Sequence, residues 1–164
     1  MHKLLPTLLA AGAVLSAGSA PPAYRTYANA RFGFRIDFPA SFRVQPEPAN
    51  GDGRRFVSAD GRTVLSAYAG YNVLDEGMAD DRRLARQGWQ EKKATFSLDQ
   101  LTGKGTGYVL SGRVQGDIFY QKTVLRSGVL STFVWQYPAA RKAAMDAVIQ
   151  HTIQTWQPGT ESNY

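Results

Sequence analysis

The stretch RFGFRIDFP, residues 31–39, decides the fold of this 164-residue chain. Its large apolar side chains stand at every second position and alternate with glycine or charged residues. Because successive side chains of a β-strand point to opposite faces, this period of two predicts a strand with one buried face. The proline that closes the stretch predicts a turn out of that strand.

A short apolar run precedes this strand at the start of the chain. Residues 4–15 are mostly apolar, follow the basic pair His2 and Lys3, and lead to small residues at 17–19. This pattern is typical of a secretory signal peptide, so we expect residues 1–19 to be removed before Ala20. The alternative is a membrane anchor that stays attached. The run is shorter than the ~20 residues that span a bilayer, which favours removal and a periplasmic or extracellular protein.

The composition predicts one exported domain stabilised by burial alone. The chain has no cysteine, so neither a disulfide nor a lipid anchor at a cleavage-site cysteine is expected. About 145 residues remain after the leader, which is the size of one ordinary domain. Nineteen Lys and Arg residues against 13 Asp and Glu residues give a net charge of +6, one less without Lys3. This excess favours anionic partners such as wall polymers or lipid headgroups, although solubility explains it equally well.

Turn residues and alternating runs predict five further strands. Residues 39–53 read as a surface loop, and Asp60-Gly61 predicts a two-residue hairpin between strands at 54–59 and 62–70. Three alternating runs with short turns between them then predict an antiparallel meander, at residues 106–114, 118–126 and 129–137. The glycine-rich residues 103–107 lack the order of a phosphate-binding loop, so we expect a hairpin connection with Lys104 exposed at its tip.

Two amphipathic helices are predicted. In residues 72–93 one face carries Leu74, Met78, Ala85 and Trp89, and charged residues occupy the other faces. A closing helix begins at Pro138 and ends at Pro158-Gly159. Its broad apolar face consists of Ala140, Ala144, Met145, Val148, Ile149, Thr152 and Trp156.

The fold class is therefore α+β, an antiparallel sheet of about six strands flanked by two helices. We expect one domain at 31–157, an N-terminal extension at 20–30 and a flexible tail at 158–164.

This order of elements resembles a known family. PsbP-like domains also place an F-G-F-x-I-x-F-P strand just after a leader, followed by a hairpin, a helix, a three-stranded meander and a C-terminal helix. The resemblance covers residues 27–156 and rests on Phe32, Gly33, Phe34 and Pro39, and exported bacterial domains of the DcrB type are similar. It implies an α/β/α sandwich with an antiparallel sheet. Members are mainly non-catalytic accessory proteins, and the matched residues are structural, so the resemblance implies no catalytic residue and no cofactor.

The residues themselves offer little for catalysis. His151 is the one histidine after the leader, no Gly-x-Ser-x-Gly motif is present, and a position at the edge of the closing helix suits a half-solvated ring better than a general base. With one histidine and no cysteine, a transition-metal site is not expected. The carboxylates Asp75, Glu76, Asp80 and Asp81 fit the start of a helix, where they complement its dipole, better than a calcium site. We therefore do not expect the protein to be an enzyme.

Basic and aromatic residues are the candidates for a binding site. Arg82, Arg83, Arg86, Lys92 and Lys93 lie on or just after the middle helix and would form an anion- or partner-binding surface if they converge. The alternative is a scatter of solvated charges. Most aromatic side chains belong in a core, but Tyr71 and Tyr137 stand near strand ends and are candidates for the border of a cleft.

Three functional hypotheses follow. The leading one is a non-catalytic exported binding or accessory protein of the cell envelope that acts through a protein partner or an anionic polymer. The second is a small-molecule or glycan-binding module with an aromatic-lined cleft. The third is a carboxylate-dependent hydrolase of wall or polysaccharide substrates, which needs two carboxylates facing each other across a groove. Nucleic acid is not an expected partner, because the leader directs the chain away from it. The outer edges of the sheet are further sites for pairing with another chain.

Overall fold

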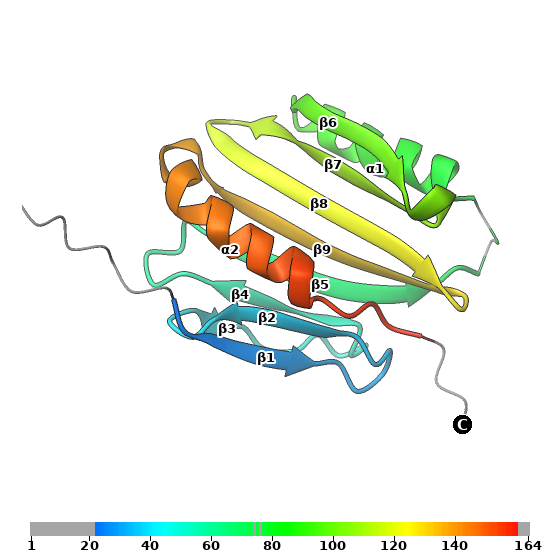
Figure 1. Ribbon diagram of the computed structural model, residues 1–164, viewed down its shortest axis with the longest axis horizontal. Helices are drawn as coiled ribbons and strands as arrows, with labels where there is room; N and C mark the ends of the chain where they lie inside the picture. The colour runs from blue at the N-terminus through cyan, green and yellow to red at the C-terminus, as the bar shows by residue number, and fades with distance from the viewer. Residues whose placement is uncertain (1–21, 74, 76, 161–164) are drawn as a thin grey trace, which may run out of the picture.

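The computed structural model of the protein describes residues 22–73, 75 and 77–160, so the expected signal peptide lies outside the described residues. Within this part, a seven-stranded antiparallel sheet dominates the fold (Figure 1). In spatial order its strands are β3 (Arg43–Val44), β4 (Gly53–Val57), β5 (Val64–Tyr71), β9 (Val129–Pro138), β8 (Asp117–Arg126), β7 (Gly107–Val114) and β6 (Thr95–Thr102).

A ribbon and two helices complete the described part of the chain. β1 (Tyr24–Ala28) and β2 (Arg35–Pro39) pair with each other as a separate antiparallel ribbon. The helices are α1 (Met78–Glu91) and α2 (Lys142–Thr155), with short 3-10 turns at η1 (Gly103–Gly105) and η2 (Ala139–Arg141).

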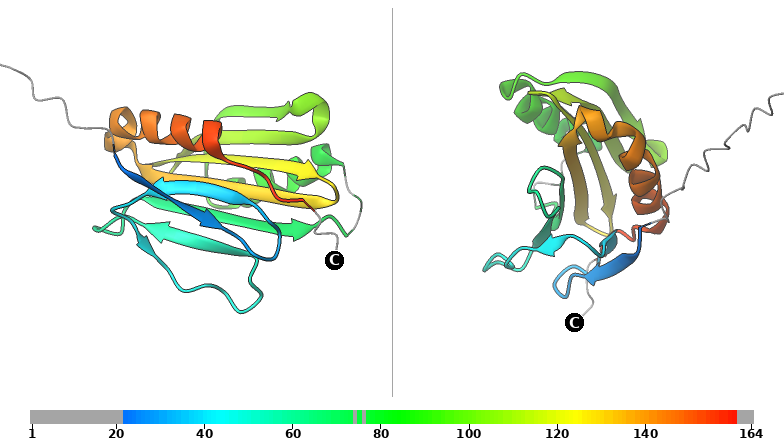
Figure 2. Two further views of the ribbon diagram at one scale, coloured as in Figure 1. Left: turned by 60° about the horizontal axis from the view of Figure 1, so that its bottom comes forward. Right: turned by 90° about the vertical axis from the view of Figure 1, so that its left-hand side faces the viewer.

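The strand β9 faces a different apolar cluster on each side. Phe133 and Trp135 belong to a cluster that also holds side chains of α2 and the ribbon, whereas Leu130 and Val134 pack against the cluster under α1. This is the alternation that the sequence predicts for residues 129–137. The two helices therefore lie on opposite faces of the sheet, as Figure 2 shows. The predicted α+β fold, an antiparallel sheet between two helices, is confirmed.

The ribbon and α2 cover one face together. Ile36 and Phe38 are buried, and the Phe38 ring stacks on Phe56 of β4 at 4.2 Å. Trp135 Nε1 donates a hydrogen bond of 3.3 Å to Thr152 Oγ1 of α2. The chain after α2 then exchanges two backbone hydrogen bonds with the ribbon, between Arg35 and Gln157, at 2.9 and 3.0 Å. Helix, ribbon and sheet thus share one core.

The α1 face has a smaller core with a buried polar chain inside it. Trp89 of α1 stacks on Phe119 of β8 at 3.9 Å, and its Nε1 donates to Gln121 Oε1 at 2.8 Å. Gln121 Nε2 in turn donates to the hydroxyl of Tyr108 at 3.1 Å. Trp89 Nε1 and Gln121 Nε2 thus each have an acceptor, which offsets the cost of burying these donors.

Three strands of the structure are absent from the six that the sequence predicts. β1 lies inside the segment expected to be an N-terminal extension, and β3 lies inside the expected surface loop. β6 escapes the period-two pattern because a β-bulge between Phe96 and Leu98 shifts its register against β7. The sequence signal for these strands is weak for three reasons. β3 has only two residues, β6 contains a bulge, and β1 pairs with β2 alone.

The first turns also differ from prediction. Gly33 has a φ of +70°, so residues before Arg35 form a turn, although Phe32 and Phe34 are both buried as predicted. The β4–β5 connection spans residues 58–63 rather than Asp60-Gly61 alone. Arg141 of η2 enters this connection, where it forms an ion pair with Asp60.

The helices keep most of their predicted faces. Met78 and Trp89 of α1 are buried, while Leu74 lies outside the described residues. On the closing helix Ala140 and Ala144 are exposed, contrary to prediction. Ala140 lies in η2, where a tighter turn changes side-chain direction. The expected flexible tail is docked up to Thr160, because Gly159 N donates to Ser131 Oγ at 2.9 Å and Thr160 N to Phe32 O at 3.2 Å.

A substitution of Gly112 tests the close approach of β7 to β6. An added Cβ would overlap the carbonyl oxygen of Thr95 and stand 3.0 Å from Phe119 Cε1. We expect Gly112→Ala to lower the free energy of unfolding by about 1–3 kcal/mol, measured as a lower urea midpoint at unchanged slope. Gly70→Ala on β5 is the control, since nothing lies within 4 Å of its Cβ position. Equal midpoints for the two variants would contradict this packing.

Candidate functional site

A groove of about 560 Å³ runs beside α2 on the face of the sheet that α1 does not cover. We call it the α2 groove. It exists because α2 and the ribbon cover β9 and the strands beyond it, while β7 and β6 are open on this face (Figure 1). Its floor is formed by Ile118 and Tyr120 of β8 and Ser111 of β7. The walls are formed by Lys142, Asp146, Ile149 and Gln150 of α2 on one side and by Thr95, Phe96 and Ser97 of β6 on the other.

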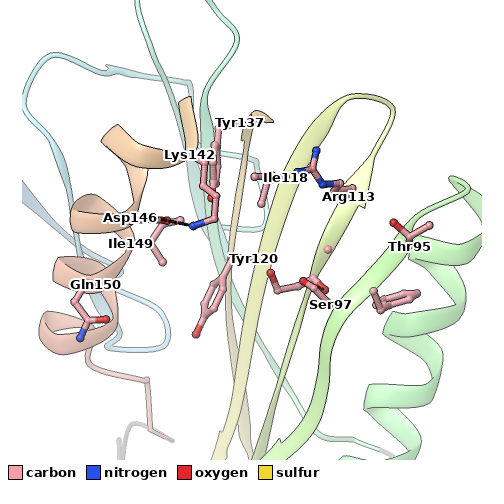
Figure 3. Close-up of a pocket in the computed structure, with 13 residues that line it drawn as sticks. Thr95, Ser97, Arg113, Ile118, Tyr120, Tyr137, Lys142, Asp146, Ile149 and Gln150 are labelled. Carbon is pink, nitrogen blue, oxygen red and sulfur yellow. Dashed lines mark hydrogen bonds and ion pairs between the residues drawn. The ribbon is translucent and has the colours of Figure 1, made fainter. Parts of the chain in front are cut away.

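Aromatic rings and hydroxyl groups make this groove amphipathic. The Tyr120 side chain stands between α2 and the β6 wall in Figure 3, and Tyr137 lies deeper, 2% exposed. Burial raises the pKa of both phenols, and the nearby Asp146 carboxylate raises that of Tyr137 further. Both hydroxyls therefore stay neutral and able to donate hydrogen bonds at physiological pH. The arrangement suits a ligand with apolar parts and hydrogen-bond acceptors.

The groove carries one uncompensated positive charge. Lys142 Nζ forms an ion pair of 2.7 Å with Asp146 Oδ2 one turn along α2. Arg113 of β7 lines the groove opposite this pair and forms no ion pair with any residue in the described part of the chain (Figure 3). A guanidinium group without a carboxylate partner is suited to bind an acidic group of a ligand.

The predicted basic surface on α1 is only partly free. Arg82 Nη1 and Arg86 Nε form ion pairs with the two oxygens of Asp99 on β6, at 2.6 and 2.8 Å. These two ion pairs attach α1 to the edge of the sheet, so neither arginine is free to bind an anion. Arg83 pairs loosely with Asp80 at 3.4 Å. Lys92 lies over the Trp89 ring at 4.8 Å, and Lys93 is exposed just after the helix. The five side chains therefore do not form one uniform patch.

The two candidate cleft aromatics lie apart. Tyr137 lines the α2 groove, as a strand-end position suggests. Tyr71 is 46% exposed at the other end of the sheet, where its ring meets the edge of Phe32 at 5.1 Å. Because β5 and β9 are antiparallel and Tyr71 pairs with Val129, Tyr71 and Tyr137 are separated by most of the length of β9. One shared cleft between them does not form.

The sequence does not single out Arg113, Tyr120 or Lys142 as groove residues. The alternation of β7 contains a signal for Arg113, since it falls on the face opposite Tyr108, Leu110 and Val114. That alternation says which face a side chain occupies, but the position of α2 over the neighbouring strands comes from tertiary packing.

His151 has a carboxylate partner that the sequence does not show. Its Nε2 lies 2.9 Å from Asp37 Oδ2 on the ribbon, and its ring stacks on Tyr24 at 3.6 Å. Thr26 donates to the other oxygen of Asp37 at 2.6 Å. The Thr26 hydroxyl therefore points to the carboxylate and not to the imidazole, so the contact that activates a nucleophile is not made. The cluster attaches β1 and β2 to α2.

Carboxylates do not assemble into a hydrolytic or metal site among the described residues. The α2 groove contains one carboxylate, Asp146, which is ion-paired. Asp99 is held by two arginines, and Asp117 accepts a hydrogen bond of 3.0 Å from Gln136. In residues 22–73, 75 and 77–160 no group of three or more His, Cys, Asp or Glu side chains is placed to hold a metal ion. The same residues contain no helix long and apolar enough to cross a membrane.

Comparison with known proteins shows the fold. No protein-family model matches the sequence, and no curated protein sequence does. Among solved structures, the fold is similar to the solution structure of cyanobacterial PsbP (CyanoP) from Synechocystis sp. PCC 6803, with a TM-score of 0.61 and 13% sequence identity. The similarity covers 90% of this chain and 99% of that one. The protein therefore has a PsbP-like fold, as the sequence resemblance implies.

The Asp37 contacts predict a pH dependence of stability. Burial raises the pKa of Asp37, but hydrogen bonds from Thr26 and the contact with His151 outweigh it, so the folded pKa lies below the ordinary 3.8. A carboxyl with a depressed pKa stabilises the fold above its unfolded pKa, and this contribution is lost as the pH falls through the folded value. We expect Asp37→Asn to unfold at a lower urea concentration than the parent at pH 7, with the difference shrinking below pH 3.8.

A matched control for this titration is Asp80→Asn, whose carboxylate forms only an exposed pair on α1. Exposed pairs contribute little, so its urea midpoint should stay close to that of the parent at both pH values. A midpoint difference for Asp37→Asn that is the same at pH 7 and at pH 2.5 would contradict the assigned cause.

Proposed function

We propose that this protein is an exported, non-catalytic binding or accessory protein of the cell envelope, and that it binds a protein partner through the α2 groove. Export is supported by the leader pattern of residues 1–19. The absence of an activated nucleophile beside His151 and of a carboxylate pair in the groove supports a binding role in the described part of the chain.

The observation that carries the proposal is the combination of open shape and uncompensated charge in the groove. The groove is bordered by a helix on one side and by the last strand of the sheet on the other, and it is lined by rings, hydroxyls and Arg113. Tyr and Arg are the residue types that supply most binding energy at protein interfaces. The positive net charge of the chain also favours an acidic partner.

A small-molecule or glycan ligand is the second candidate for the same groove. Its 560 Å³ fall within the usual range for ligand pockets. The Tyr120 and Tyr137 rings with their neutral hydroxyls are the specific observation in its favour. The hydrolase hypothesis has no such observation, because Asp146 is the one carboxylate of the groove and pairs with Lys142.

Site-specific cross-linking tests the proposal. A photo-reactive amino acid at Gln150 should capture one envelope protein in the intact source cells, because this side chain lines the groove. The same group at Gln154, exposed on α2 one turn further along and outside the groove, is the control and should capture none. Arg113→Glu should abolish the Gln150 product by reversing the unpaired charge, while Arg43→Glu on β3 should leave it intact.

The outcomes separate the two candidates. Equal products from Gln150 and Gln154 would contradict a partner in the groove. No product from Gln150, together with a ligand whose thermal stabilisation of the protein disappears in Tyr120→Ala, would support the small-molecule candidate instead.

A further inference from the structure

We propose that β6 is the docking edge for the partner: an extended segment of the partner protein adds to the sheet beside β6, and this segment carries acidic residues at its two ends. The inference rests on the proposed function, since it names the kind of segment that a protein partner would supply. It concerns the outer edge of β6, whereas the cross-linking experiment concerns the groove inside that edge.

β6 is an open edge of the sheet. It is the last strand in the spatial order and has eight residues, Thr95–Thr102, and in the described part of the chain it pairs with β7 alone. Its sequence, TFSLDQLT, contains no proline, lysine or arginine, and Leu101 is 43% exposed. Native edge strands are protected by such residues, by β-bulges, by inward-pointing charges or by a covering element. β6 has one bulge and one inward-pointing charge, and its regularly paired residues from Leu98 to Thr102 remain suited to receive another strand.

The opposite edge of the sheet, formed by β3, is protected against pairing with another strand. β3 has two residues, Arg43 and Val44, and two prolines follow it at Pro46 and Pro48. A strand this short offers almost no backbone for pairing, and prolines have no N–H to donate. The contrast makes β6 the edge on which strand addition is possible.

The one charge on β6 does not protect it. Asp99 turns toward α1, where Arg82 and Arg86 hold its two oxygens at 2.6 and 2.8 Å. Arg82 also donates to the backbone carbonyl of Asp99 at 3.3 Å, so this carbonyl already has a donor. An approaching strand therefore meets no free charge along β6 itself. The bulge between Phe96 and Leu98 interrupts pairing only locally.

Positive charge stands at both ends of the strand. Lys92 and Lys93 stand before it, separated from Thr95 by Ala94, and Lys104 follows it at the exposed tip of η1. Neither Lys93 nor Lys104 forms an ion pair with a described residue, and the neighbouring Glu91 accepts a hydrogen bond from Gln87 at 3.5 Å. A segment with acidic residues at both ends and a neutral, strand-forming centre complements this distribution.

The same charges disfavour a second copy of this chain as the occupant. If two β6 strands paired antiparallel, Lys92 and Lys93 of one copy would lie opposite Lys104 of the other. Parallel pairing would place Lys93 opposite Lys93. Like charges directly opposite each other destabilise strand pairing in both cases.

Defined peptides test the inference on the intact mature protein. The probe is a ten-residue peptide with six alternating threonine and valine residues between two aspartates at each end. One matched peptide replaces the aspartates by lysines, and a second keeps them but is N-methylated at alternate central amides. Binding is followed by NMR of the ¹⁵N-labelled protein and by hydrogen exchange of the β6 amides.

The aspartate peptide should shift and protect amides of β6, and the N-methylated peptide should not bind. The lysine peptide should bind at least about fivefold more weakly, the factor that one exposed charge pair can contribute. Lys93 and Lys104 have φ values of +62° and +57°, so Lys93→Gly with Lys104→Gly removes both charges at positions that suit glycine. This variant should weaken binding of the aspartate peptide by a similar factor, while Arg43→Gln with Arg62→Gln, remote from β6, should not.

Other results would overturn the inference. These are equal binding of the aspartate and lysine peptides, shifts confined to residues outside β6, no binding at all, or self-association of the protein through β6 in sedimentation measurements. If such a result is found while Gln150 still captures a protein partner, the proposed function stands and only the docking edge is wrong. If the peptides bind at β6 but Gln150 captures nothing, the groove assignment is wrong instead.

Discussion

The fold depends on the burial of β9 on both of its faces. Phe133 and Trp135 are fully buried under α2 and the ribbon, and Thr132, on the other face, is 6% exposed. β5 and β8 pair with both of its edges, so the backbone of β9 is hydrogen-bonded on both sides. Thr132 shares a buried hydrogen bond of 2.9 Å with Thr123 of β8, which satisfies two hydroxyls at once. A shift of one residue would exchange the two faces and disrupt both clusters.

Unequal coverage of the sheet generates the groove and the open edge. On one face α2 and the ribbon extend over the half of the sheet that includes β4 and β5, and on the other face α1 covers the half that includes β6 and β7. The α2 side of β6 and β7 is therefore left open, and the α2 groove forms there. β6 is the last strand of the same half of the sheet, so the groove and the open edge both follow from how the helices cover the sheet.

Ion pairs within the fold decide which basic side chains are held by a carboxylate. Asp99 holds Arg82 and Arg86 against the sheet, and Asp60 holds Arg141. Arg113, Lys93 and Lys104 have no such carboxylate in the described residues, so their charge is directed outward.

The sequence by itself determined the elements whose side chains alternate strictly. The period of two at Ile36 and Phe38 and along residues 129–137, and the helical spacing of Met78 and Trp89, predicted which faces are buried, because local geometry sets that period. Only the tertiary structure decided the contacts between distant segments. Asp37 meets His151, Asp99 meets Arg82, and Arg113 and Lys142 line one groove, because helices and strands remote in sequence pack together. The bulge in β6 breaks the period of two, so the local pattern does not predict this strand. The position of β6 at the edge does not follow from the local pattern either, because the packing of both cores sets the strand order.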